Sequence, residues 1–282
     1  MRQVLALRAR SSVAPADLVA IAFTVLIAVA VVLGPVIAPY SPTTFHPEHA
    51  LQPPSLQFIF GTDEFGRDIF SRVLSGARPT LVVAFCSALV GVTLGTTTGL
   101  IAGLAGGVVD EVIMRFMDAL MSFPALILSM LVVVMLGTNP VNVVVALGIV
   151  FWPRSARLVR SVAVELARRD FVDAARSRGE GWLYLLGREL LPNVQMIVVV
   201  DLSLRITYGV LLAASLAYLG IGVAPPTPAW GLMVRDGQQF IEIAPWIVVF
   251  PCLAVALTAV GTMIVGERLR RGVTLPGGER LR

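Results

Sequence analysis

Six apolar segments, each close to the length that crosses a bilayer, constrain this chain more than any other feature of its sequence. A transmembrane helix needs about 20 consecutive apolar residues. Hydrophobic residues make up 56% of the 282 residues and charged residues 14%, whereas soluble domains carry about 25% charged residues. The sequence therefore predicts an all-α membrane protein with six transmembrane helices. The segments are Leu18–Ala38, Thr80–Leu104, Val112–Leu136, Val141 to about Leu158, Val194–Leu219 and Pro245–Val265.

Polar stretches between these segments divide the chain. The first apolar segment is too long for a signal-peptide core, so we expect it to be retained as a span. In the second, Gly91, Gly95, Gly99 and Gly103 recur every four residues, a spacing that favours close packing of one helix on another. The expected divisions are a tail at 1–17, a helix at 18–38, a loop at 39–79, a core at 80–266 that includes a loop at 159–193, and a tail at 267–282.

The arginines predict the orientation. All 22 basic residues are Arg. With the N-terminus inside, 17 of them fall in the inner segments, four fall in the outer segments and Arg205 lies within a span. Because inner loops of membrane proteins are enriched in Arg and Lys, both termini are predicted to be cytoplasmic. The loop at 159–193 is then cytoplasmic and the loop at 39–79 is external.

The absence of lysine limits the chemistry that this chain can perform. A P-loop needs a Lys that reaches the nucleotide phosphates, so any dependence on ATP must come from another subunit. The sequence also contains no H-E-x-x-H, G-x-S-x-G or C-x-x-C motif, which argues against an intramembrane enzyme. We therefore expect no catalytic residue and no cofactor in this chain.

A polar island at Arg169–Asn193 interrupts the apolar pattern. Its first part suits a short amphipathic helix that Asp170 could cap. Gly179 and Gly181 are expected to interrupt that helix, and Pro192 is expected to stop a second helix. A helix, a glycine turn and a second helix would form a compact knob. The alternative is a solvated loop with little structure. The apolar positions of the first helix are Phe171, Val172, Ala174 and Ala175.

The order Asp173-Ala174-Ala175, Gly179, Leu191-Pro192 resembles the EAA signature of permease subunits of ABC importers. Asp173 replaces the usual Glu of that signature, and Glu189 stands where His is common. In that family the loop forms a coupling helix that docks on the ATPase. The resemblance thus implies a docking role for Asp173, Ala174, Ala175, Arg176, Arg178, Gly179, Glu180, Gly181 and Trp182.

The external loop carries a second signature. On a helical projection of Gly61–Arg78, apolar side chains share one face and Asp68, Ser71 and Ser75 lie opposite, which predicts a helix in the membrane interface. The alternative is a simple anchor for the next span. The string G-T-D-E-F-G-R-D-I-F-S-R resembles the shorter, C-type permease of the dipeptide/oligopeptide/nickel family. Its signature positions are Gly61, Thr62, Asp63, Gly66, Arg67, Asp68 and Arg72. Further matches lie at Met114–Pro124, Trp152–Arg160 and in the loop 220–244.

Ionisable residues within predicted spans are candidates for function. Asp201 and Arg205 are four residues apart, so they share one helix face and can pair. Arg115 and Asp118 are three apart at the start of the third span. For both pairs the sequence leaves two readings open: a structural ion pair, or a contact with the transported solute.

The two histidines and two cysteines do not predict a metal site. His46 and His49 are separated by Pro47, which breaks any helix that would align them, and no further ligand is near. We expect them in a solvated loop. Cys86 and Cys252 both lie in apolar runs, where free thiols are typically buried core residues.

The resemblance implies a permease subunit that forms half of the translocation pathway in a bacterial cytoplasmic membrane. Its implied partners are a second homologous permease, two ATP-binding subunits that hold ATP and Mg, an extracytoplasmic binding protein and the lipid bilayer, with no nucleic acid. Peptides, nickel and other small solutes all remain possible substrates. The alternative is a self-contained secondary transporter or channel, which would carry charges deep in several spans and an internal repeat.

Overall fold

The computed structural model describes residues 33–34 and 36–272, with side chains as far as 268. These residues form helices and no strand, apart from one isolated bridge between Thr62 and Asp68. The elements are η1 (Pro47–His49), α3 (Ile69–Ala105), α4 (Gly107–Met121), α5 (Ala125–Leu136), α6 (Pro140–Leu166), α7 (Asp170–Ser177), α8 (Trp182–Tyr184), η2 (Leu185–Leu190), α9 (Leu191–Tyr218), α10 (Trp230–Gly237), η3 (Gln238–Phe240) and α11 (Trp246–Gly272).

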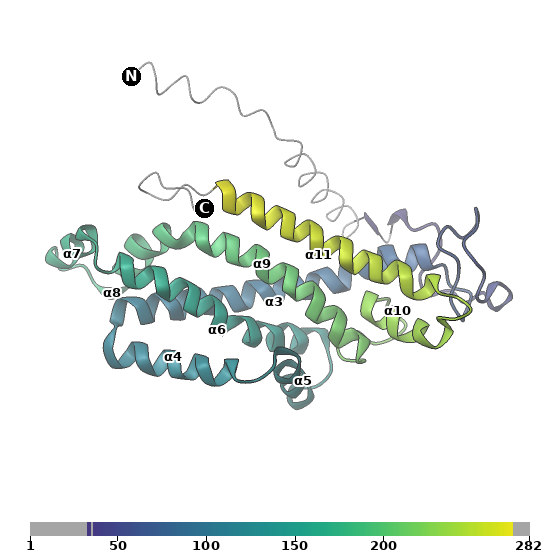
Figure 1. Ribbon diagram of the computed structural model, residues 1–282, viewed down its shortest axis with the longest axis horizontal. Helices are drawn as coiled ribbons and strands as arrows, with labels where there is room; N and C mark the ends of the chain where they lie inside the picture. The colour runs from purple at the N-terminus through teal and green to yellow at the C-terminus, as the bar shows by residue number, and fades with distance from the viewer. Residues whose placement is uncertain (1–32, 35, 273–282) are drawn as a thin grey trace, which may run out of the picture.

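The bundle is elongated, and its two ends are built differently (Figure 1). One end carries α7 and α8, and the other carries α10 and the loop that precedes α3. We call them the α7 end and the α10 end. Helix α3 has 37 residues, which corresponds to about 55 Å at 1.5 Å per residue. The two predicted functional loops therefore lie at opposite ends of the molecule.

The predicted membrane fold is confirmed in part. Among the described residues, four helices are long and apolar enough to cross a membrane: α3, α6, the continuous run Trp182–Tyr218, and Trp246–Arg268 of α11. The bent pair α4 and α5 provides a fifth if it counts as one span. The first predicted span, Leu18–Ala38, lies largely outside the described residues.

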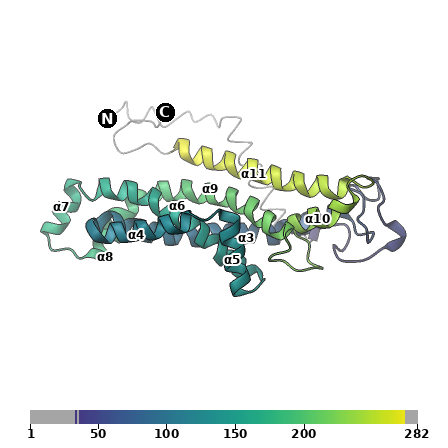
Figure 2. The same ribbon diagram turned by 60° about the horizontal axis from the view of Figure 1, so that its bottom comes forward.

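The third predicted span, Val112–Leu136, is broken, so its prediction as one helix was wrong. Helix α4 ends at Met121, α5 starts at Ala125, and the two helices are bent by 92°. The break follows from Pro124, because proline disfavours helical geometry in the residue before it. Figure 2 shows α5 turning away from the bundle at this point.

The predicted interfacial helix over 61–78 was also wrong. Helix α3 begins at Ile69, where the Asp68 side chain accepts a hydrogen bond from the Ser71 amide at 2.8 Å, and it continues without a break to Ala105. The preceding turns contain Gly61 and Gly66, both with positive φ. Asp68, Ser71 and Ser75, expected on a solvated face, are buried.

Pro192 does not stop a helix, contrary to the prediction from sequence. The chain runs from α8 through the π-helical turn η2 into α9, and the Leu191 amide bonds to the Leu186 carbonyl. Pro192 thereby falls in the first turn of α9, where a missing N–H is tolerated. The side-chain amide of Asn193 donates to the Glu189 carbonyl at 2.6 Å, which satisfies one carbonyl next to the proline.

The glycine face predicted on α3 is confirmed as a packing seam against α6. A Cβ at Gly91 would lie 2.5 Å from the Phe151 Cβ, and one at Gly103 would lie 2.5 Å from the Ala163 Cβ. Gly99 is equally close to the backbone of α6. Because no side chain fits at these positions, the two helices are held along most of their length at backbone contact distance.

Candidate functional sites at the two ends of the bundle

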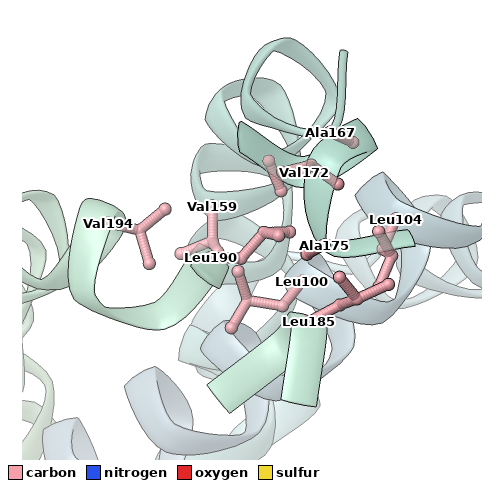
Figure 3. Packing of buried hydrophobic residues seen from close by; sticks show 10 residues of the cluster. Leu100, Leu104, Val159, Ala167, Val172, Ala175, Leu185, Leu190 and Val194 are labelled. Atoms are coloured by element: carbon pink, nitrogen blue, oxygen red, sulfur yellow. The ribbon is translucent and has the colours of Figure 1, made fainter. Parts of the chain in front are cut away.

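Helix α7 is attached to the bundle through one apolar face. Val172 and Ala175 are fully buried. They belong to a cluster that reaches α3, α6, η2 and α9, in which Leu104, Leu185 and Leu190 take part (Figure 3). The predicted amphipathic helix is therefore present, and its inner face is fixed to the long helices rather than to a flexible loop.

The end of α7 is a Schellman motif. The Gly179 amide bonds to the Arg176 carbonyl at 2.9 Å, and the Glu180 amide bonds to the Ala175 carbonyl at 3.2 Å. Gly179 has a φ of +80°, a conformation that glycine adopts at little cost. A turn at Gly179 was expected, and the structure gives its reason.

The start of α7 differs from the prediction. Arg169 occupies the N-cap position, with extended backbone and no side-chain cap, and Asp170 is the first helical residue. Asp170 instead places a negative charge in the first turn, where it complements the helix dipole. Asp173 adds a second acidic group to the same turn.

The outer surface of this end combines exposed apolar and charged side chains. Trp182 is 53% exposed and Leu183 is 87% exposed. Nearby ion pairs are loose: Arg176 lies 3.5 Å from Asp173, and Arg178 lies 3.8 Å from Glu180. Exposed aromatic and aliphatic groups ringed by charges are typical of surfaces that bind another protein. Ala174 and Gly181 lie exposed on the same surface.

At the α10 end, the buried carboxylate of Asp63 organises the second signature. One oxygen accepts hydrogen bonds from the amides of Phe65 and Arg67 at 3.0 and 2.9 Å. The other accepts from Nε of Arg67 at 2.6 Å and lies 3.5 Å from Nε of Arg72. Arg67 and Arg72 are themselves buried, so one buried carboxylate serves two buried guanidinium groups, and these three residues keep a net positive charge.

The remaining signature residues join this cluster to α11. The indole N–H of Trp246 donates to the Thr62 carbonyl at 3.1 Å. Both glycines are sterically required: a Cβ at Gly61 would lie 2.8 Å from the Trp246 ring, and one at Gly66 would overlap the His46 carbonyl oxygen. Together with the Asp68 cap, these contacts tie the starts of α3 and α11 together, which is a structural role.

Glu64 stands beside the cluster and is partly buried. Burial, followed by the neighbouring Asp63 carboxylate, raises the pKa of Glu64 above its usual range. Its Oε1 lies 3.4 Å from Nη2 of Arg67, and its Oε2 has no hydrogen-bond partner among the described residues. Glu64 thus adds a second carboxylate beside the two guanidinium groups of Arg67 and Arg72, although one of its oxygens is unpaired among the described residues.

Within the bundle, Asp201 and Arg205 form the pair that their spacing permits. The Arg205 guanidinium donates to one Asp201 oxygen at 3.0 and 2.8 Å. The other oxygen accepts from the hydroxyl of Ser155 on α6. The sequence did not indicate Ser155 as a partner, because the contact joins residues 46 positions apart.

Arg115 and Asp118 do not pair with each other, although they are three residues apart. Arg115 lies 3.5 Å from Glu111 on the exposed side of α4. Asp118 pairs with Arg157 of α6, and a parallel pair joins Asp110 to Arg160. The spacing of three between Arg157 and Arg160 was the available signal for these links between α4 and α6.

Comparison with known proteins assigns the chain. A family model described as "Binding-protein-dependent transport system inner membrane component" matches residues 95–275. The chain belongs to this family. The glutathione transport system permease protein GsiD of Shigella flexneri is 42% identical to this permease over 249 residues, covering 88% of this chain and 82% of GsiD. A candidate peptide transport system permease protein of Brucella suis is 37% identical over 249 residues, covering 87% and 82%.

A solved structure supports the fold. It is the crystal structure of an amino acid ABC transporter with histidines, which matches this permease with a TM-score of 0.54 and 16% sequence identity. The match covers 72% of this chain and 94% of the other. This likeness concerns the fold alone. The family assignment confirms the resemblance found in the sequence: the protein is a membrane component of a transport system, not an enzyme.

The two histidines contact the Asp63 loop through their backbones: the His46 amide donates to the Phe65 carbonyl at 3.0 Å, and the Thr62 hydroxyl donates to the His49 carbonyl. His46 is 3.4 Å from Glu48, and Nδ1 of His49 is 3.1 Å from the side-chain amide of Gln52. No group of three metal-ligating side chains occurs among the described residues. Cys86 is partly buried, but Cys252 is exposed, so the expectation that both thiols are core residues was wrong for Cys252.

Proposed function

We propose that this permease is one of two homologous membrane subunits of an ABC importer that takes up peptides or peptide-like solutes such as glutathione. The names of the relatives support this substrate class. The absence of a P-loop lysine from the sequence supports the placement of ATP and Mg²⁺ in two separate ATPase subunits. A binding protein would deliver the solute, as the family description implies.

The observation that carries the coupling part of the proposal is the construction of the α7 end. An ATPase that changes shape can move a permease only through a rigid contact. Val172 and Ala175 fix α7 to the long helices, while Asp173, Arg176 and Trp182 remain on the outside. The knob therefore has one side that transmits force and another that can bind a soluble subunit.

The proposed orientation places the α7 end in the cytoplasm and the α10 end outside, with both termini in the cytoplasm. Five arginines between Arg168 and Arg188 surround α7, and inner loops favour Arg. The Asp63 cluster and α10 then face the binding protein. This orientation brings the exposed surface of α7 to the side where ATP is available.

The mechanism follows from these assignments. Closure of the ATPase dimer on ATP would move the knob, and the helices tied to it, between an inward-facing and an outward-facing arrangement. ATP supplies the difference in binding free energy between the two states. The residues of this permease contribute shape, packing and solute contacts, and no covalent step.

The test is to perturb α7 at two points. Gly179→Val introduces a β-branched side chain at positive φ, which costs at least about 1 kcal/mol, and it tilts the start of the second helix. Asp173→Lys reverses a charge on the exposed face. Each variant is expected to weaken binding of the ATPase subunits about tenfold for each 1.4 kcal/mol of lost docking energy, so that less ATPase is recovered with the purified permease. A variant that still binds the ATPase is expected to uncouple hydrolysis from uptake.

The controls separate strain from docking. Gly137→Val places the same side chain at positive φ in the turn between α5 and α6, where only the Asn142 side chain lies within 4 Å. Asp173→Asn removes the charge without reversing it. Complex recovery, ATPase rate and uptake are measured together in proteoliposomes. Normal values for both α7 variants would show that the knob does not couple the two activities.

A further inference from the structure

Three arginines recur every third residue along α6, and among the described residues only two of them have partners. Arg157 pairs with Asp118 and Arg160 pairs with Asp110, both on α4. Arg154 forms no hydrogen bond or ion pair with any residue that the structure describes. Its side chain instead lines a small cleft at the bend between α4 and α5. The other lining residues are Leu120, Met121, Phe123, Ala125, Leu128 and Val150.

The position of Arg154 in α6 makes this lack of a partner significant. It is the first charged residue counted from Pro140, and 14 residues correspond to about 21 Å of helix. The side chain is exposed, and all of its neighbours in the cleft are apolar. Arg154 thus lies toward the inner end of the predicted span Val141 to about Leu158, where a charge that faces lipid is still costly, so such residues face protein or a water-filled cavity. The exposed side of Arg154 should therefore face either water or the second permease, and the first test below distinguishes the two.

The bend brings the ends of two helices to the same place. Helix α5 starts at Ala125 without a side-chain cap, so the positive end of its dipole opens beside the cleft. Broken helices with free ends of this kind surround solute sites in other transporters. The C-terminal end of α4 at Met121 brings an opposing negative dipole end to the same bend, so Arg154 is the group that carries the argument.

We propose that Arg154 contacts the transported solute and that its guanidinium binds a carboxylate of that solute in the cleft at the α4–α5 bend. This inference rests on the proposed function, because peptides and glutathione carry free carboxylates. A guanidinium suits this task since it offers two parallel N–H groups to the two oxygens. The other side chains of the cleft are apolar and offer no hydrogen bond, which leaves the charge as the main side-chain feature for recognition.

The first test asks whether Arg154 attracts anions in a wet cleft, and it does not depend on the identity of the solute. Val150 lies one helical turn from Arg154 and lines the same cleft. Val150→Cys is introduced after replacement of Cys86 and Cys252, and the assembled transporter is treated with an anionic and a cationic water-soluble thiol reagent. The measured quantity is the rate of the anionic reagent divided by that of the cationic reagent. This ratio should be at least about threefold higher with Arg154 present than in the Arg154→Gln background, because a unit charge about 7 Å away in water has an effect of that size.

Two results would overturn the proposal at this stage. If neither reagent reacts, lipid or the second permease covers the cleft. If both reagents react and Arg154→Gln does not change the ratio of their rates, an acidic group of the second permease neutralises Arg154. Arg78→Gln, at an exposed arginine on α3, is the charge-matched control and should leave the ratio unchanged.

The second test measures uptake in proteoliposomes of a peptide with a free C-terminal carboxylate and of the same peptide as its amide. Binding-protein affinity for each is measured separately, and the binding protein is kept saturated. Arg154→Gln should reduce uptake of the free acid about tenfold or more and leave the amide unchanged, and Arg154→Lys should retain part of the activity. Equal losses for both peptides, together with poor assembly, would indicate an ion pair between subunits and refute the proposal.

The two tests fail independently. If the parent transporter takes up neither peptide, the proposed substrate class is wrong, and the labelling experiment alone decides whether Arg154 forms an anion site. If the parent takes up the free acid and Arg154→Gln does so equally well, the substrate class stands and the assignment of Arg154 falls.

Discussion

Removal of Asp201 alone should destabilise this permease strongly. Removal of Asp201 and Arg205 together should cost less than the sum of the two single variants. Asp201 is 1% exposed. It accepts two hydrogen bonds from Arg205, at 3.0 and 2.8 Å, and one from Ser155. Asp201→Ala leaves the buried Arg205 guanidinium uncompensated, which costs about 3–5 kcal/mol in soluble proteins. Removing both charges eliminates that penalty.

The expected coupling is smaller than the single-variant cost because unfolded segments in a membrane find other partners. Cycles on polar contacts between membrane helices give about 0.6 kcal/mol on average and up to about 1.7 kcal/mol. The Asp201–Arg205 contact is charged and involves two donors, so we expect a value near the upper end, about 1–2 kcal/mol. Ser155→Ala removes one hydrogen bond to a charged group and should cost about 1.5–3 kcal/mol.

The measurement is a double-mutant cycle on the free energy of unfolding of the purified permease in bicelles, with recovery of the complex as a second readout. The matched control is the exposed pair Arg115–Glu111, also four residues apart, whose side chains are 78% and 67% exposed. Exposed pairs of this kind contribute about 0.3–0.5 kcal/mol. If the effects of the Asp201 and Arg205 variants add to within about 0.5 kcal/mol, the value expected for the exposed pair, the ion pair does not stabilise α9 and each charge has a separate role.

Two further predictions concern the α10 end and the orientation. Gly66→Ala should prevent closure of the Asp63 loop and severely lower the recovery of folded protein, because its Cβ would overlap the His46 carbonyl oxygen. The control Gly106→Ala is also at positive φ, but no atom lies within 4 Å of the added Cβ, so it should cost only about 1–2 kcal/mol. Equal recovery of the two variants would refute this role of Gly66. Cysteines at the exposed Ser55 and Ser177, in a background without Cys86 and Cys252, should react with an impermeant reagent in intact cells only at Ser55→Cys, and the opposite result would reverse the proposed topology.

Local patterns in the sequence predicted much of the fold. Glycines that recur every four residues identified the α3 face that packs on α6, since only a close helix contact benefits from that spacing. Of the four apolar positions predicted for α7, Val172 and Ala175 form the buried face, whereas Phe171 and Ala174 are exposed. Asp201 and Arg205 pair because their spacing in one helix already brings them together. These features depend on neighbours within a few residues.

The features that the sequence did not predict depend on distant residues or on competing local effects. Pro124 and Pro192 are both preceded by apolar residues, yet the first breaks a span and the second begins a helix. The difference arises from the π-helical turn η2, which no periodicity reveals. The solvated face expected for Asp68, Ser71 and Ser75 became buried because the loop from 39 to 68 folds over it.

The packing indicates which part of this permease changes between transport states. The α3–α6 seam has backbone contacts along most of its length, so any sliding there would lose close packing at every glycine. Helix α4, in contrast, buries only Met117 and is joined to α6 by two ion pairs. Ion pairs at a partly exposed surface reform at low cost after a displacement, whereas interlocked cores do not. Motion of α7 should therefore move the α3–α6 unit as one body and change its contact with α4 and α5. The cleft lined by Arg154 lies at that contact, so its width, and with it the hold on a solute carboxylate, should differ between the two states.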